Sequence, residues 1–577
     1  MGFCSNQLLC LCTLLSLLVC SLTSRAEAEF ENEVSSRLVI NTSSIVATIS
    51  DHFLCVTVDF TEARECDYGW CKGTATGVLY LDLENERLGN TLAGLAPVMV
   101  RLGGVLQDLV VYDVGDLLPS ERCTPFVYNE TALLYFDGGC LGMERWDALN
   151  QFFMKRGVSV AFGLNALYGR PKSEEVKHIT TPWNPSNTEN FIRYTRDRAY
   201  PVIAWELGNE LFGDISQGTT VPAALYAADV IMLRDIVDKL YQDEASKPSV
   251  VAPDMTQFGP EAPFSESEFA IFMDTLGDGV VDAVTRHIYN LGKGLYGTDD
   301  MINNKIRDPK VAAAEEDVYK IFQSVLKEYP KTSAWVGEGG GSARGGLEGV
   351  TDVFISAFWY LDQLGTAAKY NNQAFCRQSF VGGNYALLDV DFNPNPDYYG
   401  ALLWRQLMGN GVFKVEIEGG TNEVRAYAHC QRNNQGGLTL LILNYSNVTR
   451  HHLDLSLLGY PADSSPSSFN QLLTEKKFQD DKIHLLSSDG ASSGDFRLEY
   501  HMSALNRNVS SSVVLLNGQP LLMTPSGELP TLALVEVNST SPISVEPLTY
   551  AYVVIQNANV PACAASDSET FRSQSTA

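Results

Sequence analysis

Apolar and polar positions alternate along the chain in two different ways. From about residue 50 to residue 410, short apolar runs typical of buried parallel strands alternate with amphipathic stretches typical of helices, such as Met143–Lys155, Pro222–Tyr241 and Asp317–Tyr329. Most of the strand-like runs end at a polar residue or a glycine. This alternation predicts a (β/α)8 barrel, or TIM barrel. The seven predicted strands are Phe53–Asp59, Val98–Leu102, Val158–Asn165, Ile203–Leu207, Ser249–Ala252, Ala283–His287 and Ser333–Val336.

The pattern changes after about residue 410. Short runs of alternating polarity, separated by Gly, Asn, Ser and Pro, predict an all-β region, most simply a β-sandwich. The isolated segment Arg37–Val46 is a candidate strand of the same sandwich. The predicted fold class is therefore α/β plus all-β. We expect an N-terminal segment at 29–48, a catalytic barrel at 49–410, a β-sandwich at 411–565 and a polar tail at 566–577.

The first 28 residues have the pattern of a secretory signal peptide. Residues 8–22 are rich in Leu and Cys, and Ala26-Glu27-Ala28 offers a cleavage site before Glu29. A membrane anchor is the competing interpretation, but the apolar run is short for a membrane span. We therefore predict the secretory pathway, ending outside the cell, in the cell wall, or in a lysosome or vacuole. Six Asn-x-Ser/Thr sequons agree with this: Asn41, Asn129, Asn444, Asn447, Asn508 and Asn538.

Eight cysteines remain after the predicted cleavage. In an oxidising compartment two close pairs, Cys66 with Cys71 and Cys123 with Cys140, are candidates for loop disulfides. Cys430 and Cys563 lie near the two ends of the predicted sandwich and are candidates to join them. No Cys-x-x-Cys motif or histidine cluster has the spacing of a zinc site, so we expect neither a metal nor a cofactor.

The net charge narrows the possible ligands. With 41 Lys and Arg against 69 Asp and Glu, the chain carries −28, and removing residues 1–28 leaves this unchanged. Such a surface repels polyanions, which excludes nucleic acid as a partner and disfavours a densely sulfated glycan. After the leader, no run is long enough to cross a membrane. The sequence does not predict the oligomeric state.

Two glutamates each follow an apolar strand. Ile203–Leu207 leads into Gly208-Asn209-Glu210, and Ser333–Val336 leads into Gly337-Glu338, followed by three glycines. Catalytic groups of a (β/α)8 barrel lie at the C-terminal ends of its strands. Glycoside hydrolysis needs two carboxylates that flank the scissile bond. The alternative is that both glutamates are ordinary polar loop residues. The pair instead predicts a glycoside hydrolase.

Further motifs occur in a specific order over nearly the whole mature chain. They are Val56-Thr57-Val58-Asp59, Arg101-Leu102-Gly103-Gly104, Phe162-Gly163-Leu164-Asn165-Ala166-Leu167, Trp205-Glu206-Leu207-Gly208-Asn209-Glu210, His287-Ile288-Tyr289-Asn290-Leu291-Gly292, Cys376-Arg377-Gln378, Gly382-Gly383-Asn384-Tyr385 and Asn395-Pro396-Asp397-Tyr398-Tyr399. With these motifs the chain resembles glycoside hydrolase family 79, particularly its plant heparanase-like and β-glucuronidase members. The resemblance implies a retaining barrel enzyme with a β-sandwich that acts on β-D-glucuronides without a metal.

The same resemblance suggests roles for individual residues. Glu210 looks like the acid/base and Glu338 like the nucleophile. Asn209 would contact the sugar 2-hydroxyl or be an ordinary turn residue. The remaining candidates for substrate binding are less specific. Gly382, Gly383 and Tyr385 could bind a uronate carboxylate or form a tight loop. Asp59 could form a hydrogen bond with a sugar hydroxyl, and Gln378 is a weaker candidate. His287 could orient Glu338, line the subsite or be a structural residue.

Arg344 departs from the family pattern, because it stands in the loop after Glu338 where relatives have a tyrosine. It either pairs with the uronate carboxylate or points to solvent.

Three functions follow as hypotheses. The first is a secreted β-glucuronidase for plant-type glycans or small aglycone glucuronides. The second is an endo-β-glucuronidase of heparan sulfate, and the third is an inactive glycan-binding homologue.

Overall fold

The computed structural model describes residues 32–61, 76–117, 122–170, 178–212, 218–245, 247–256, 266–293, 297–434, 436–458 and 496–564. The predicted signal peptide and the polar tail lie outside these ranges. Within them, no helix has the length and apolar character needed to cross a membrane.

Eight parallel strands close into a barrel, in the order β10-β11-β12-β14-β16-β3-β4-β9. Seven of them lie where the apolar runs predicted strands. The eighth, β16, lies at the Cys376-Arg377 motif and was not predicted. The barrel strands are β3 (Leu54–Asp59), β4 (Val98–Gly103), β9 (Val158–Leu164), β10 (Val202–Leu207), β11 (Ser249–Met255), β12 (Ala283–Ile288), β14 (Ser333–Gly339) and β16 (Asn372–Arg377).

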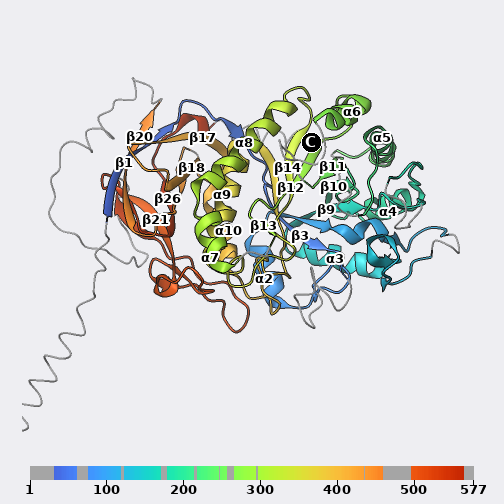
Figure 1. Cartoon of the computed structure of the whole chain (residues 1–577), viewed down its shortest axis with the longest axis horizontal. Coiled ribbons are helices and arrows are strands. Elements are labelled where there is room, and N and C mark those ends of the chain that lie inside the picture. The colour runs from blue at the N-terminus through green and yellow to red at the C-terminus, as the bar shows by residue number, and fades with distance from the viewer. Residues whose placement is uncertain are drawn as a thin grey trace, which may run out of the picture.

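Helices surround the barrel, and several begin at a clear sequence signal. The Asn85 side chain accepts hydrogen bonds from the first turn of α2, and Asp308 does so for α8, which has a proline at its start. The helices are α2 (Glu86–Gly94), α3 (Met143–Lys155), α4 (Ser186–Asp197), α5 (Ala223–Leu240), α6 (Glu266–Leu276), α7 (Thr298–Met301), α8 (Pro309–Leu326), α9 (Ser356–Lys369) and α10 (Pro396–Leu407). Helices α9 and α10 lie between the barrel and the second region (Figure 1).

The second region is a 12-stranded sheet whose two halves pack around one apolar core, as a sandwich does. The N-terminal β1 runs antiparallel to β17 and parallel to β20, so the blue strand in Figure 1 lies among orange and red ones. Its strands are β1 (Asn32–Asn41), β2 (Ala47–Thr48), β17 (Met408–Glu418), β18 (Val424–Gln431), β19 (Leu438–Asn444), β20 (Thr449–Leu458), β21 (Phe496–Ala504), β22 (Val514–Leu516), β23 (Gln519–Pro520), β24 (Val535–Asn538), β25 (Ile543–Val545) and β26 (Thr549–Ile555).

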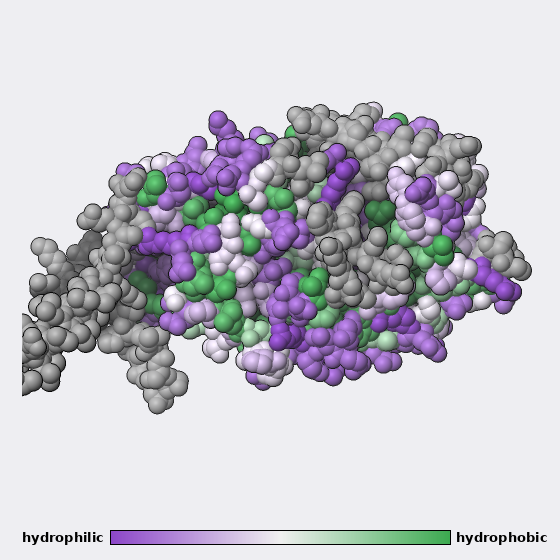
Figure 2. Space-filling model, turned by 60° about the horizontal axis from the view of Figure 1, so that its bottom comes forward, coloured by the Kyte–Doolittle hydropathy of each residue, from purple (hydrophilic) through white to green (hydrophobic). Residues whose placement is uncertain are grey.

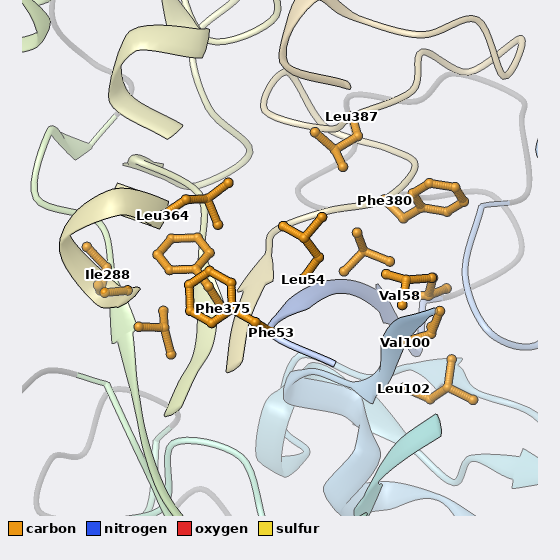
Figure 3. Packing of buried hydrophobic residues seen from close by; sticks show 14 of the residues in the cluster. Phe53, Leu54, Val58, Val100, Leu102, Ile288, Leu364, Phe375, Phe380 and Leu387 are labelled. Atoms are coloured by element: carbon orange, nitrogen blue, oxygen red, sulfur yellow. The ribbon is translucent and has the colours of Figure 1, made fainter. Parts of the chain in front are cut away.

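Strand alternation separates the barrel core from the site. In β3, Leu54 and Val58 face the surrounding helices, where they pack in the apolar layer that Figure 3 shows. Cys55 faces the barrel interior, whose lower part is filled by small side chains such as Ala161 and Ala204. The next inward positions on the same strand are Thr57 and Asp59, which lie nearer the C-terminal end. The polar side chains of the barrel interior therefore lie at its C-terminal end, above a layer of small apolar side chains.

Three disulfides are present among the described residues. Two of them confirm predicted pairs, Cys123–Cys140 and Cys430–Cys563. The third, Cys55–Cys376, was not predicted, and it joins neighbouring barrel strands β3 and β16.

The remaining predicted disulfide falls in the gap between residues 61 and 76 of the described chain. Cys66 and Cys71 both lie there, outside the described residues. The pairing of Cys66 with Cys71 is therefore neither confirmed nor contradicted, and it stays a prediction.

The prediction that Asn444 is glycosylated is wrong. Its side chain is fully buried, and its Nδ2 donates hydrogen bonds to the carbonyls of Thr449, Val545 and Glu546 at 2.8–3.0 Å. This amide nitrogen cannot carry a sugar without unfolding the surrounding strands. Asn447, Asn508 and Asn538 are exposed, and Asn41 and Asn129 are partly exposed, so these five sequons stay predictions.

Figure 2 shows hydrophilic residues spread over the face it presents, with groups of apolar residues between them.

Four short strands form two small pairs in the loop region after β4: β5 (Val111–Tyr112) pairs with β8 (Cys140–Leu141), and β6 (Val127–Tyr128) pairs with β7 (Phe136–Asp137). Two more, β13 (Gly292–Lys293) and β15 (Ser342–Ala343), pair with each other. The β13–β15 pair joins the loop after His287 to the loop after Glu338. It therefore fixes two of the loops that surround the strand ends.

Candidate active site

Glu210 and Glu338 lie side by side at the C-terminal end of the barrel. Their carboxylate oxygens approach within 4.8 Å of each other. Glu338 lies on β14, where the register with β12 shifts at the position that points it inward. Glu210 follows β10 through a turn in which Gly208 and Glu210 both have positive φ, 74° and 54°. Because a side-chain-bearing residue rarely adopts this conformation, the surrounding contacts must hold it.

Arg101 of β4 connects four of the acidic and polar groups. Its guanidinium is buried and donates to Glu206 at 2.7 Å, to Glu338 at 3.3 Å, to Asn209 at 3.0 Å and to Asp254 at 3.1 Å. A planar guanidinium with five donors suits such a multiple contact. Arg101 therefore fixes Glu338, the candidate nucleophile, relative to Asn209, which precedes the candidate acid Glu210.

His287 lies on the other side of the pair. Its Nδ1 is 2.6 Å from Glu210 and 3.8 Å from Glu338, and its Nε2 is 2.8 Å from Asp254. Burial alone would lower the pKa of His287, but the charges of Asp254 and Glu338 outweigh it and raise that pKa well above its usual value. The ring thus lies between three carboxylates, which favour its protonated form. Of the roles considered for His287, the contacts favour orienting the glutamates.

Asp59 and Gln378 form a second polar group at the rim. Gln378 donates to Asp59 Oδ2 at 2.8 Å and accepts a hydrogen bond from Thr57. The other oxygen of Asp59 is buried without a hydrogen-bond partner among the described residues. A buried acceptor of this kind is available to a ligand hydroxyl.

Two glycine-rich loops meet beside Glu338. The Tyr289 hydroxyl donates to Glu338, and the Tyr289 and Tyr385 rings lie 6.4 Å apart. An added Cβ at Gly340 would come within 2.7 Å of Tyr289 and 3.0 Å of Tyr385, so only glycine fits. Gly382 and Gly383 both have positive φ. In this part of the chain the glycines allow backbone N–H groups to approach a ligand closely.

Arg344 belongs to the same two-loop region but not to the buried cluster. It is exposed with φ 62°, and the next residue, Gly345, accepts a hydrogen bond from the backbone N–H of Asn384 at 2.7 Å. The loop that carries Arg344 is therefore attached to the loop that carries Gly382 and Gly383. Both interpretations of Arg344, a uronate contact and a solvent-exposed residue, remain predictions.

Sequence reasoning missed several residues of this cluster. Arg101 and Tyr289 stand in two of the motifs, and Asp254 lies just beyond the predicted strand Ser249–Ala252, but nothing in the sequence distinguished them from residues that face the helices. Their position at the strand end was the available signal. Only the inward direction of each side chain, together with closure of the barrel, identifies them as part of the site.

Burial dominates the electrostatics of the site. It raises the pKa of Glu206 and of Glu338 to about 7, although Arg101 and His287 act in the opposite direction. Asp254 behaves differently, because His287 and Arg101 outweigh its burial and hold its pKa below the usual value.

Glu210, His287 and Glu338 have the spacing of metal ligands within the described ranges, but their close mutual contacts are those of acid–base partners. Independence from metal stays a prediction.

The raised pKa values predict that the folded chain is more stable in mild acid. Asp108, Glu206 and Glu338 have pKa values raised to about 7 by burial, and Asp397 to about 6. Between about pH 5 and pH 7 the folded chain keeps protons that the unfolded chain has released, so the free energy of unfolding falls as the pH rises. We expect the melting temperature to be several degrees lower at pH 8 than at pH 5, at constant ionic strength.

A control for this pH dependence is Glu206→Gln, which removes one of the titrating groups and should flatten the curve. A melting temperature that rises from pH 5 to pH 8 would contradict the prediction.

Comparison with known proteins agrees with this geometry. Residues 35–365 match the model of the "Glycosyl hydrolase family 79, N-terminal domain". The chain is 39% identical to heparanase-like protein 3 of Arabidopsis thaliana, over 90% of this chain and 92% of that protein. It is 34% identical to baicalin-beta-D-glucuronidase of Scutellaria baicalensis, over 88% of this chain and 90% of that protein. It is 27% identical to mouse heparanase, over 89% and 92%.

Solved structures agree at the level of the fold. The crystal structure of a 4-O-alpha-L-rhamnosyl-beta-D-glucuronidase from Fusarium oxysporum is similar with a TM-score of 0.59, at 14% identity, over 90% of this chain and all of the other. A family 51 arabinofuranosidase from Xanthomonas axonopodis pv. citri gives 0.60 at 12% identity, with the same coverage. The family match over more than half of the chain and the identity to plant relatives show that this protein is a glycoside hydrolase and belongs to glycosyl hydrolase family 79.

Proposed function

We propose that this protein is a secreted retaining β-glucuronidase that hydrolyses β-D-glucuronides of plant-type glycans or of small aglycones. The observation that carries the mechanism is the approach of Glu210 and Glu338 to within 4.8 Å. Retaining glycosidases place the two carboxyl groups about 5–5.5 Å apart, whereas inverting enzymes need roughly 6.5–9.5 Å to fit a water molecule. The proposed secretion rests on the sequence of residues 1–28 and on the five remaining sequons.

In the proposed reaction Glu338 attacks the anomeric carbon while Glu210 gives its proton to the leaving oxygen. Arg101 and Tyr289 hold the attacking carboxylate through its two oxygens. The deprotonated Glu210 then takes a proton from water, which attacks the same carbon and releases the sugar. His287, in contact with both glutamates, balances the negative charge as it moves from one to the other.

Substrate contacts follow from the groups that face the pair. Asn209 lies beside Glu210 and is oriented by Arg101, which supports a contact with the sugar 2-hydroxyl. Asp59 has a buried oxygen available for another hydroxyl, and Gln378 holds Asp59 in place. The backbone at Gly382 and Gly383, with Tyr385, is the proposed site for the uronate carboxylate. Backbone donors and a phenol suit a planar anion.

A hydrolysis screen tests this proposal. The purified protein is assayed with small aryl β-glucuronides, the flavone glucuronide baicalin, arabinogalactan and heparan sulfate. Proton NMR of the first product should show the β-anomer of glucuronic acid. A first-formed α-anomer would exclude the retaining mechanism. Cleavage of heparan sulfate alone would favour the endo-β-glucuronidase, and binding without any cleavage would favour the inactive homologue.

The prediction for Arg344 addresses specificity. If Arg344 pairs with the uronate, Arg344→Ala should reduce kcat/KM for an aryl glucuronide about tenfold to a hundredfold, since a charge-assisted hydrogen bond contributes about 1.5–3 kcal/mol. The matching glucoside, which lacks the carboxylate, should change by less than about threefold by the same reasoning. Arg37→Ala, at an exposed arginine of β1 in the sandwich, is the control. Equal losses on the two substrates would eliminate the uronate contact and leave its recognition to the Gly382–Gly383 loop.

A further inference from the structure

Asp108 is a buried carboxylate that the proposed reaction does not use. It lies in the short 3-10 helix that follows β4 (Val105–Leu109), and only 1% of its surface is exposed. Its Oδ1 accepts the backbone N–H of Ala166 at 2.8 Å, and its Oδ2 accepts the backbone N–H of Asn209 at 2.8 Å. The described lysines and arginines form no ion pair with it. Asp108 thus directs both oxygens of a buried carboxylate at backbone amides.

These two amides belong to different barrel strands. Ala166 follows β9, and Asn209 follows β10. One carboxylate on the β4 loop therefore connects the C-terminal ends of three successive strands. Burial raises the pKa of Asp108, and the two hydrogen bonds act against it by stabilising the ionised form.

The hydrogen bond from the backbone N–H of Asn209 to Asp108 lies one residue before Glu210 in the chain. Asn209 is held at its backbone by Asp108 and at its side chain by Arg101, at 2.8 Å and 3.0 Å. The backbone N–H of Glu210 is in turn held by Asp254. Because Glu210 has a positive φ, its conformation depends on such contacts. Releasing Asn209 would let the turn relax and move the Glu210 carboxyl away from the leaving oxygen.

We propose that Asp108 is a positioning residue for the general acid: by accepting hydrogen bonds from Asn209 and Ala166, it holds the turn that points Glu210 at the leaving group. The inference rests on the proposed role of Glu210. Both oxygens of Asp108 are buried and accept backbone N–H groups, so it would act through the turn and not on the substrate. A carboxylate is needed here because it has an acceptor on each side, whereas an amide of the same shape would face one of the two N–H groups with its own NH2.

The test variant is Asp108→Asn, compared with the wild type on two aryl β-glucuronides. A phenyl glucuronide needs protonation of its leaving group, and a 2,4-dinitrophenyl glucuronide does not. We expect kcat/KM to fall about tenfold to a hundredfold for the phenyl substrate, the range that a displaced catalytic group produces. For the dinitrophenyl substrate the fall should stay below about threefold, since departure of a good leaving group depends little on the acid.

Backbone amide exchange provides a readout that does not depend on turnover. Peptides that contain residues 166 and 209 should exchange faster in Asp108→Asn than in the wild type, because each variant molecule loses an acceptor for one of these amides. Asp282→Asn is a control for removing a carboxylate that accepts a backbone N–H far from the site. Asp282 also accepts a backbone N–H, that of Val250 at 2.8 Å, but at the N-terminal end of the barrel. It should change neither the leaving-group dependence nor exchange at residues 166 and 209.

Equal losses on the two substrates would overturn the inference, because Asp108 would then support the site as a whole and not the acid. Unchanged kinetics with unchanged exchange would overturn it as well. If Asp108→Asn does not fold, Asp108→Glu keeps both acceptors but displaces them by one methylene, and it should give the same leaving-group dependence. Glu210→Gln is measured in parallel. If that variant shows no leaving-group dependence, the proposed role of Glu210 fails; if it shows the dependence and Asp108→Asn does not, only the Asp108 inference fails.

Discussion

Glu338→Gln is expected to abolish hydrolysis of β-glucuronides, with kcat reduced on the order of 10⁴-fold or more. The carboxamide keeps the shape of the side chain and can still accept the hydrogen bond from Tyr289. It cannot, however, form the covalent bond to the anomeric carbon. The measurement is the turnover of an activated aryl glucuronide, together with the melting temperature.

The matched control for this variant is Glu315→Gln. Glu315 is also buried and also bonded to an arginine, Arg286 at 2.9 Å, but it lies on α8, outside the barrel. It should therefore report the loss of stability caused by removing a buried charge that is paired with arginine. If Glu338→Gln kept near wild-type turnover while folded, the nucleophile would have to be another residue.

Glu210→Gln is expected to produce a large loss that depends on the substrate. For a leaving group that needs a proton, kcat/KM should fall about 10²- to 10⁴-fold, the usual contribution of general acid catalysis. For a 2,4-dinitrophenyl glucuronide the loss in kcat/KM should be far smaller. Hydrolysis of the covalent intermediate should then limit turnover, because the general base is missing as well.

Added azide gives an independent check of the same variant. Azide needs no general base, so it should attack the glycosyl-enzyme, restore turnover of the activated substrate and yield the β-glucuronosyl azide. In Glu338→Gln, where no intermediate forms, azide should have no such effect. A similar loss on both substrates without rescue by azide would contradict the role of Glu210.

Local sequence signals were sufficient for the barrel strands and for the two glutamates. Seven strands and helix α3 lie where the apolar periodicity placed them, because a strand or a helix is recorded in contiguous residues. The eighth strand, β16, was missed because the Cys376-Arg377-Gln378 run is short and does not end in an obvious turn. Glu210 and Glu338 could be found because each lies at or just beyond the C-terminal end of an apolar strand run.

The partners of these glutamates could not be found in this way. Arg101 contacts Glu338 across 237 positions of the chain, and the Cys55–Cys376 bond spans 321. Such pairs come together only when β16 closes against β3, an event that no local pattern records. Asn444 gives the opposite case, since its sequon is intact in the sequence while three carbonyls occupy its amide in the fold.

The sequence by itself therefore determined the class of the fold, the positions of most strands and the two glutamates. The tertiary structure alone decided which charges surround them. A carboxylate at a strand end acquires its pKa and its orientation from side chains of neighbouring strands and from the exclusion of water, and both arise only when the barrel closes. For this reason Arg101, His287, Asp254 and Asp108 became parts of one site only in the folded molecule.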